Sequence, residues 1–222
     1  TAPVSINSQI ELTGQTLAVP GDISSGAFLL VAATLRQGSD VLLPGVGVNP
    51  TRSAVLEILR LMGADIELSR ERIESNEPVC DLRVRSAELK GIDVPPEFAA
   101  NAIDEFPVIA VAAAGASGIT RIRRVSELRV KESDRIAAMV QGLTRLGIDA
   151  VEYPDGMDVL GGQFTSGSVD SFGDHRIAMA FAVAGCFADG PVEVSEADNI
   201  RTSFPNFASL MNSVGLNIRE YP

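Results

Sequence analysis

The chain has 222 residues, of which 45% are hydrophobic and 21% charged, and its formal net charge is −11. This much apolar sequence is ample for the buried core of one large domain or two small ones. The acidic balance, with no basic stripe to offset it, argues against nucleic acid as a partner. The longest apolar run, residues 177–188, is too short to cross a bilayer, so we expect no membrane span.

The two cysteines, Cys80 and Cys186, lie far apart and form no disulfide framework. No CxxC pair or histidine cluster indicates a metal, and nothing indicates another cofactor. No signal peptide opens the sequence, so we expect a protein of the reducing cytoplasm. Because the sequence starts at Thr1 and its first residues resemble the middle of a protein, we expect a fragment of a longer chain.

Three apolar segments, each opening near an acidic residue and ending at a glycine, predict helices that are buried on every side. A strand-like stretch follows each one. The helical segments are residues 21–38, 104–118 and 173–190, and the strands are residues 40–46, 119–125 and 191–197.

A second, amphipathic helix is predicted after each strand, because apolar residues recur there at i, i+3, i+4 and i+7. In the middle helix Gly142 occupies one of the apolar positions. Gly63, Gly147 and Gly215 follow the three stripes and are natural C′ terminators. Each glycine introduces a further predicted strand, and these strands are residues 64–69, 148–153 and 216–221.

This order of elements recurs three times at nearly constant spacing along the chain. We therefore predict one α/β domain of three βαβα-type units, in which three buried parallel helices are surrounded by sheets and outer helices. The units are expected at about residues 20–100, 101–172 and 173–222.

Residues 129–135, RVKESDR, gather five charged side chains of both signs in a chain that is otherwise apolar and acidic. The repeat spacing places Arg135 at the start of the amphipathic helix of the second unit. Lys131 and Glu132 lie on the approach to it. A solvated helix start is the simpler interpretation of such a run.

The same spacing predicts Thr51 and Ser203 as N-caps of the other two amphipathic helices. The buried helices carry Asp22, Asp104 and Asp174 at their starts. Each aspartate has a simpler interpretation as an N-cap, and for Asp22 we prefer it.

Parallel buried helices would place all these N-termini on one face, where free N–H groups and helix dipoles favour an anion. Arginines on that face, such as Arg135 and Arg176, repel the dipoles and each other unless an anion lies between them. His175 is the only histidine, and taken alone it has a simpler interpretation as an ordinary helix-start residue. The second and third units both place an arginine beside acidic groups, which favours an anion-binding site.

Several segments resemble motifs of the 3-phosphoshikimate 1-carboxyvinyltransferase family, also called EPSP synthases. The resemblance covers essentially the whole chain in order, and RVKESDRIAAM together with GDHRIAMAFAVA is its most specific part. The matching segments are residues 20–33, 101–114, 129–139, 173–184 and 199–207.

The resemblance implies one domain of an inverse α/β barrel protein, whose two domains each contain three repeats and close on the substrates. This chain resembles the C-terminal half, with residues 1–19 as the end of the preceding domain or crossover segment and residues 20–222 as the C-terminal domain. The family's N-terminal Lys-Ser pair, glycine-rich loop and Ser-x-Gln stretch have no counterpart here. Those groups supply much of the shikimate 3-phosphate site, so the isolated fragment is expected to be inactive.

The implied reaction transfers the enolpyruvyl group of phosphoenolpyruvate to the 5-hydroxyl of shikimate 3-phosphate, without a cofactor. By resemblance, Arg135 and Arg176 bind phosphoenolpyruvate and Lys131 reaches shikimate 3-phosphate. Many members of the family have a lysine directly before TFP. This chain has Thr202 there, preceded by Arg201, to which we assign no role.

The acidic and neutral groups have implied roles in moving protons. Asp104 would contact shikimate 3-phosphate and accept the hydroxyl proton. Glu132 would deliver a proton to the methylene carbon and later retrieve it, and His175 would orient the bound phosphoenolpyruvate.

Two other functions remain open at this point. A UDP-N-acetylglucosamine enolpyruvyl transferase shares the fold and the chemistry, although the residues of the RVKESDR and GDHR motifs favour shikimate substrates. A non-catalytic anion-binding repeat domain would not need Asp104, Glu132, Arg135 and Arg176 together. The acidic charge disfavours RNA-processing relatives of the repeat fold.

Overall fold

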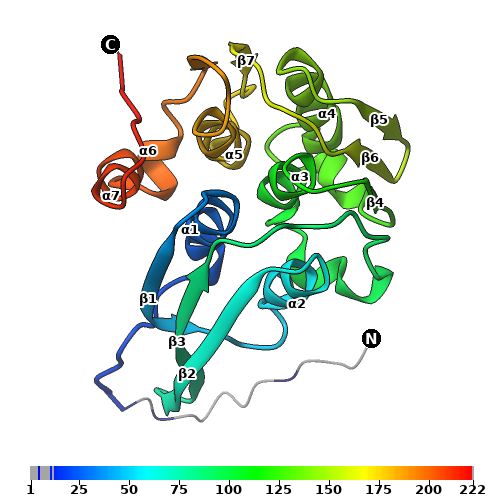
Figure 1. Ribbon diagram of the computed structural model, residues 1–222. Helices are drawn as coiled ribbons and strands as arrows, with labels where there is room; N and C mark the ends of the chain where they lie inside the picture. Colours follow the sequence, from blue (N-terminus) through cyan, green and yellow to red (C-terminus); the bar gives the residue numbers. More distant parts are fainter. Residues whose placement is uncertain (1–4, 6–10, 12, 222) are drawn as a thin grey trace.

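The computed structural model describes residues 5, 11 and 13–221 (Figure 1). Much of the predicted crossover segment, residues 1–19, lies outside the described residues. Within the described part, no helix combines the length and apolar character that a membrane crossing needs.

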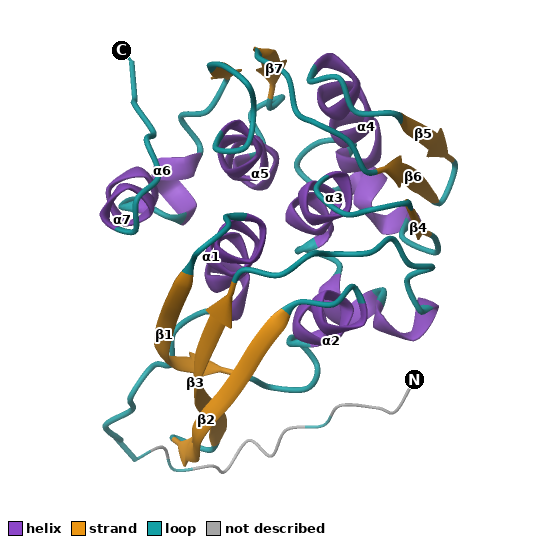
Figure 2. Ribbon diagram, in the orientation of Figure 1, coloured by secondary structure: helices purple, strands orange, loops and turns teal. Residues whose placement is uncertain are grey.

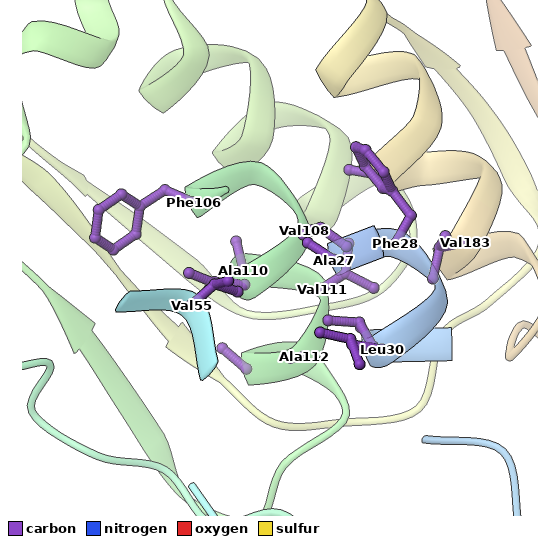
Figure 3. Close-up of a cluster of buried hydrophobic side chains, with 14 of the residues drawn as sticks. Ala27, Phe28, Leu30, Val55, Phe106, Val108, Ala110, Val111, Ala112 and Val183 are labelled. Atoms are coloured by element: carbon purple, nitrogen blue, oxygen red, sulfur yellow. The ribbon is translucent and has the colours of Figure 1, made fainter. Parts of the chain in front are cut away.

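Three inner helices form the centre of the molecule: α1 (Ile23–Leu35), α3 (Phe106–Ala114) and α5 (His175–Gly185). Each contacts the other two, and all three appear end-on in Figure 2. Every residue of α3 is buried, as expected for a helix surrounded by other elements. Figure 3 shows this core, with Ala27 and Leu30 of α1, Val111 of α3 and Val183 of α5. The predicted buried helices are confirmed.

The first two units each carry a three-stranded antiparallel sheet outside the inner helices. In each sheet, the strand that comes last in the sequence lies between the other two. That middle strand was not predicted, because the sequence interpretation placed the last strands of the first two units at residues 64–69 and 148–153. The first sheet contains β1 (Asp40–Gly47), β2 (Asp65–Glu74) and β3 (Glu77–Arg85). The second contains β4 (Ile119–Ile122), β5 (Ala150–Tyr153) and β6 (Gly156–Leu160).

A parallel pair, β7 (Gly167–Asp170) and β8 (Val192–Ser195), is joined through α5, so the third unit starts a few residues before the predicted boundary at residue 173. Strand β7 was also missed from the sequence. The segments before and after each of the other two inner helices also pair in parallel, but only through isolated bridges. These bridges are Gly21 with Val46, Lys90 with Ser117, and Asp93 with Arg121.

The outer helices are α2 (Ala54–Leu61), α4 (Arg135–Arg145) and α7 (Phe207–Ser213). The predicted terminating glycines are confirmed, since Gly63, Gly147 and Gly215 have φ values of 105°, 81° and 102°. Shorter helices occur at α6 (Ile200–Ser203), η1 (Pro96–Phe98), η2 (Ala100–Ala102) and η3 (Ser126–Val130).

The predicted strand at residues 216–221 is wrong, because that segment has no strand neighbour among the described residues. The side chain of Asn212 makes the backbone hydrogen bonds that a neighbouring strand would otherwise make. Its Nδ2 donates to the carbonyl of Ile218 at 2.8 Å, and the N–H of Ile218 donates to its Oδ1 at 2.7 Å.

The predicted N-caps Thr51 and Ser203 are also wrong. The N–H of Thr51 donates to the side chain of Asn49 in a turn, and α2 starts later, after Ser53. Ser203 is the last residue of α6 rather than the cap of α7. The next residue precedes a proline and leaves helical geometry, which ends the short helix there.

Candidate active site

The N-termini of the inner helices lie at one end of the molecule, as predicted. Asp22 caps α1 by accepting the N–H of Ser25 at 2.9 Å, and Asp174 caps α5 by accepting the N–H of Arg176 at 2.9 Å. Asp104 lies just before α3 and caps nothing, since the cap position is the next residue. Capping therefore explains Asp22 and Asp174 but leaves Asp104 for another role.

Arg135, the first residue of α4, links the second and third units at this end. Its side chain is only 1% exposed, and its donors reach three carboxylates. Nε donates to Asp174 at 2.8 Å, Nη1 donates to Asp104 at 3.1 Å and Nη2 donates to Glu132 at 2.6 Å. Because Arg135 touches both Asp104 and Asp174, these contacts confirm that the two helix starts share one face.

Asp174 is fully buried and bound on several sides. Burial acts to raise its pKa, but the hydrogen bond and charge of Arg135 hold the pKa below its usual value. The hydroxyl of Ser133 also donates to it, at 3.1 Å. Asp174 is therefore an ionised partner that holds Arg135 in place, a role that the sequence alone did not indicate.

Asp104 lies at the centre of the site and is 39% exposed. Three cations surround its carboxylate: Arg135 at 3.1 Å, Lys131 at 3.6 Å and Arg176 at 3.7 Å. Burial acts to raise the pKa of Asp104, but the charge of Arg176, followed by those of Lys131 and Arg135, lowers it below the usual range. The group is thus ionised and can accept a proton once those charges are offset.

The charge run divides into a structural part and a part that faces the site. Arg129 pairs with Asp134 at 2.7 Å and with Glu152 at 2.9 Å, which fastens the segment to β5. Asp134 caps α4 by accepting the N–H of Ala137 at 3.0 Å. The solvated-helix interpretation is therefore wrong even for this part of the run.

Lys131 and Glu132 belong to the part that faces the site. The Nζ of Lys131 lies 2.8 Å from Glu127, and this hydrogen bond raises the pKa of the lysine, so it stays charged. Glu132 is 53% exposed, and within the described part of the chain its carboxylate bonds Arg135 alone. It is more accessible than Asp104, which is 39% exposed, and than the buried Asp174.

His175 and Arg176 open α5 beside Asp174. Burial, and next the charge of Arg176, lowers the pKa of His175, so its imidazole is neutral near neutral pH. Among the described residues, no side-chain hydrogen bond fixes the imidazole. The Nη1 of Arg176 donates to the carbonyl of Asp104 at 3.0 Å and to Glu105 at 3.4 Å.

The structure thus gathers all the sequence-predicted site residues at one end of the inner helices. Glu105 was missed, although two successive acids before an apolar helix, where only one residue can be the cap, were a usable signal. Arg201 lies on α6 and is 64% exposed, and its nearest described acid is Glu220 at 3.9 Å. Within the described chain it makes no hydrogen bond or ion pair with the predicted site residues.

Solved structures with a similar fold include an EPSP synthase from Acinetobacter baumannii, at 44% identity and a TM-score of 0.92. That match covers 95% of this chain and 49% of the solved one. The enolpyruvyl transferase NikO from Streptomyces tendae matches with a TM-score of 0.72 over 90% of this chain and 44% of its own, and at 16% identity it supports the fold alone. The fold is that of an enolpyruvyl transferase domain, an α/β repeat domain of inverse barrel type.

The family model of EPSP synthase (3-phosphoshikimate 1-carboxyvinyltransferase) matches residues 2–211. The 3-phosphoshikimate 1-carboxyvinyltransferase of Coxiella burnetii (strain CbuK_Q154) is 54% identical over 209 residues, which are 94% of this chain and 48% of that protein. The enzyme of the same name from Methylococcus capsulatus is 53% identical over 215 residues, covering 97% and 49%. The chain belongs to the EPSP synthase family, and it spans about half the length of the curated relatives it matches.

Proposed function

We propose that this chain is the C-terminal domain of an EPSP synthase. The full-length protein transfers the enolpyruvyl group of phosphoenolpyruvate to the 5-hydroxyl of shikimate 3-phosphate, and releases phosphate. The observation that carries the proposal is the carboxylate of Asp104, which lies within 4 Å of Lys131, Arg135 and Arg176 at the N-terminal ends of the inner helices.

Two polyanionic substrates need cations, and the three around Asp104 supply them. Arg135 and Arg176 would bind phosphoenolpyruvate, while the positive helix ends add favourable potential. Lys131 would reach shikimate 3-phosphate. In the described arrangement these cations bond carboxylates, so a substrate anion exchanges partners with Asp104 or Glu132 rather than entering an unpaired site.

This exchange provides a way to activate the base. Cations lower the pKa of Asp104 in the described arrangement. Substrate phosphate and carboxylate groups would offset those charges, so the pKa of Asp104 would rise as the site fills. Asp104 then accepts the proton of the 5-hydroxyl group, while the oxygen of that hydroxyl adds to C2 of phosphoenolpyruvate.

The other proton moves at the methylene carbon. Glu132, which is 53% exposed beside Arg135, would deliver a proton to C3 during addition and retrieve it as phosphate leaves. The neutral imidazole of His175 would orient the bound phosphoenolpyruvate by a hydrogen bond. No cofactor takes part in these steps.

The remaining partner is the N-terminal domain of the same polypeptide, which would complete the shikimate 3-phosphate site and exclude water on closure. We place the protein in the cytoplasm, because Cys80 and Cys186 are free thiols of the kind found in reducing compartments.

A phosphate-release assay on the full-length protein tests the proposal. Release should require phosphoenolpyruvate and shikimate 3-phosphate together, and should not occur with UDP-N-acetylglucosamine. Asp104→Asn should abolish most of it. The matched control is Asp93→Asn, since Asp93 lies in the connection before α3 and its side chain bonds Arg121 and no other described residue. Release with UDP-N-acetylglucosamine instead would assign the alternative reaction.

A further inference from the structure

Glu105 is a buried carboxylate directly beneath the candidate site. It is 4% exposed and occupies the N-cap position of α3, yet its side chain makes no capping bond. Burying a carboxylate costs free energy unless hydrogen bonds or opposite charges compensate. Its burial raises the pKa of Glu105 above the usual value. Because helix capping does not compensate the burial of this carboxylate, its hydrogen-bond and charge partners must do so.

The partners of Glu105 come from both of the other inner helices. From α5, the Nη1 of Arg176 donates to its Oε1 at 3.4 Å. From α1, the side chain of Ser24 lies close enough to the carboxylate to act against the rise in the pKa of Glu105. Ser24 in turn accepts from Arg52 at 3.0 Å, and Arg52 also pairs with Asp22 at 3.0 Å. Glu105, at the start of α3, thus bonds Arg176 of α5 and lies beside Ser24 of α1.

These bonds restrict the guanidinium of Arg176. Its Nη1 carries two N–H groups, and two acceptors lie beside it, namely the carbonyl of Asp104 at 3.0 Å and Glu105 at 3.4 Å. Nη2 lies 3.7 Å from the Asp104 carboxylate. Two acceptors on one nitrogen fix the plane of the guanidinium and direct its other edge toward the proposed substrate site.

We propose that Glu105 is a positioning residue, which holds the guanidinium of Arg176 in the orientation that binds the anionic groups of phosphoenolpyruvate. This inference rests on the proposed function for its substrate. It assigns Glu105 no proton transfer, since its carboxylate is 4% exposed and is held by Arg176.

Steady-state kinetics of the full-length protein test the inference. Glu105→Ala should raise the KM for phosphoenolpyruvate about tenfold, the effect of losing one charge-assisted hydrogen bond. The KM for shikimate 3-phosphate and kcat at saturation should change much less. Glu105→Gln keeps an acceptor oxygen of the same shape and should restore the KM to within about threefold of the wild type. Ser24→Ala removes one support of Glu105 and should raise the same KM by a smaller factor.

Glu97→Ala is the matched control, because this glutamate lies on η1 in the same connection and is exposed. It should leave both constants unchanged. Thermal unfolding of every variant separates a loss of fold from a loss of binding. If Glu105→Ala unfolds, Glu105→Gln and Ser24→Ala still decide the question. An unchanged KM for phosphoenolpyruvate in Glu105→Ala, or equal losses for both substrates, would overturn the positioning role.

A second measurement does not depend on turnover. The side-chain NMR signals of Arg176, assigned by comparison with Arg176→Lys, should show a restrained guanidinium in the wild type and a freely rotating one in Glu105→Ala. If the wild type lacks activity but shows this difference, the proposed function fails and the positioning of Arg176 stands. If the guanidinium rotates freely in the wild type, the positioning role fails.

Discussion

The central residue of this domain is Asp104, a carboxylate held by cations and free of any capping duty. The two arginines beside it have different roles because their side chains are buried to different extents. Arg135 is enclosed and fastens helix starts together, whereas Arg176 lies partly open beside the site. Substitutions of these residues should therefore fail in different ways.

Arg176→Ala in the full-length protein should raise the KM for phosphoenolpyruvate. A lost charged hydrogen bond is worth about 1.5–3 kcal/mol, which corresponds to a roughly ten- to hundredfold weaker interaction. Initial rates at varied phosphoenolpyruvate measure it, and Arg201→Ala, on the exposed face of α6, is the control. A wild-type KM in Arg176→Ala would remove this arginine from the binding site.

Arg135→Ala should damage the fold before it reports on binding. It would leave the buried carboxylate of Asp174 without its cation, and breaking a buried pair costs about 3–5 kcal/mol. Urea denaturation of this chain, followed by circular dichroism, gives the free energy of unfolding. Arg145→Ala, at the exposed end of the same helix, should change it little. Equal stability of Arg135→Ala and the wild type would show that the pair contributes nothing.

Asp104→Asn should lower kcat and leave both KM values nearly unchanged, because a base acts only as the proton moves. The expected loss is about 10²–10⁴-fold. Glu132→Gln should lower kcat as well. In the same samples, deuterium incorporation from solvent into the methylene group should decrease. If Asp104→Asn loses affinity while turnover survives at saturation, Asp104 is a binding residue and the base is a different group.

At the scale of elements, the three inner helices are equivalent in position but differ in their neighbours. The sequence stripe of α4 has a glycine, Gly142, where the other outer helices have an apolar side chain. The reason is the ring of Phe181 on α5, which fills that position and meets any Cβ placed on Gly142. The close contact of α4 with α5 also brings Arg135 to Asp174.

Gly142→Ala should therefore destabilise the chain, although alanine favours helix. Overpacking a buried contact costs about 1–3 kcal/mol, which exceeds the gain in helix propensity of about 1 kcal/mol. The measurement is the midpoint of urea denaturation. Gly162→Ala is the control, since its added Cβ would meet Ile148 at an ordinary 3.5 Å. An increase in stability for Gly142→Ala would mean that the ring of Phe181 moves aside freely.

At the scale of the whole molecule, ion pairs between the second and third units build the site at their junction. Asp104 and Arg135 lie in the second unit, and Asp174 and Arg176 in the third. The site is thus a property of the assembled domain. It is also only one side of the proposed enzyme, because the chain spans about half the length of its relatives.

The isolated 222-residue chain should fold but not turn over. Its inner helices have their own core, whereas the groups that complete the shikimate 3-phosphate site belong to the proposed partner domain. A cooperative denaturation transition together with no phosphate release above background is the expected result. Robust release from this chain alone would contradict the two-domain mechanism.

The sequence by itself determined the helices, because apolar periodicity and terminating glycines are local signals. It also indicated the charged residues of the site, through the run at residues 129–135 and the repeat spacing. Alternating or β-branched runs also predicted β1, β2, β4, β5 and β8. The tertiary structure decided the remaining strands, since a strand exists only with a neighbour. Strand β3 gained one on each side, and residues 216–221 found none among the described residues. The tertiary structure alone decided the pairing of Arg135 with Asp174 and of Arg176 with Glu105. Those partners are distant in sequence, and only the packing of the inner helices brings their charges within hydrogen-bonding distance.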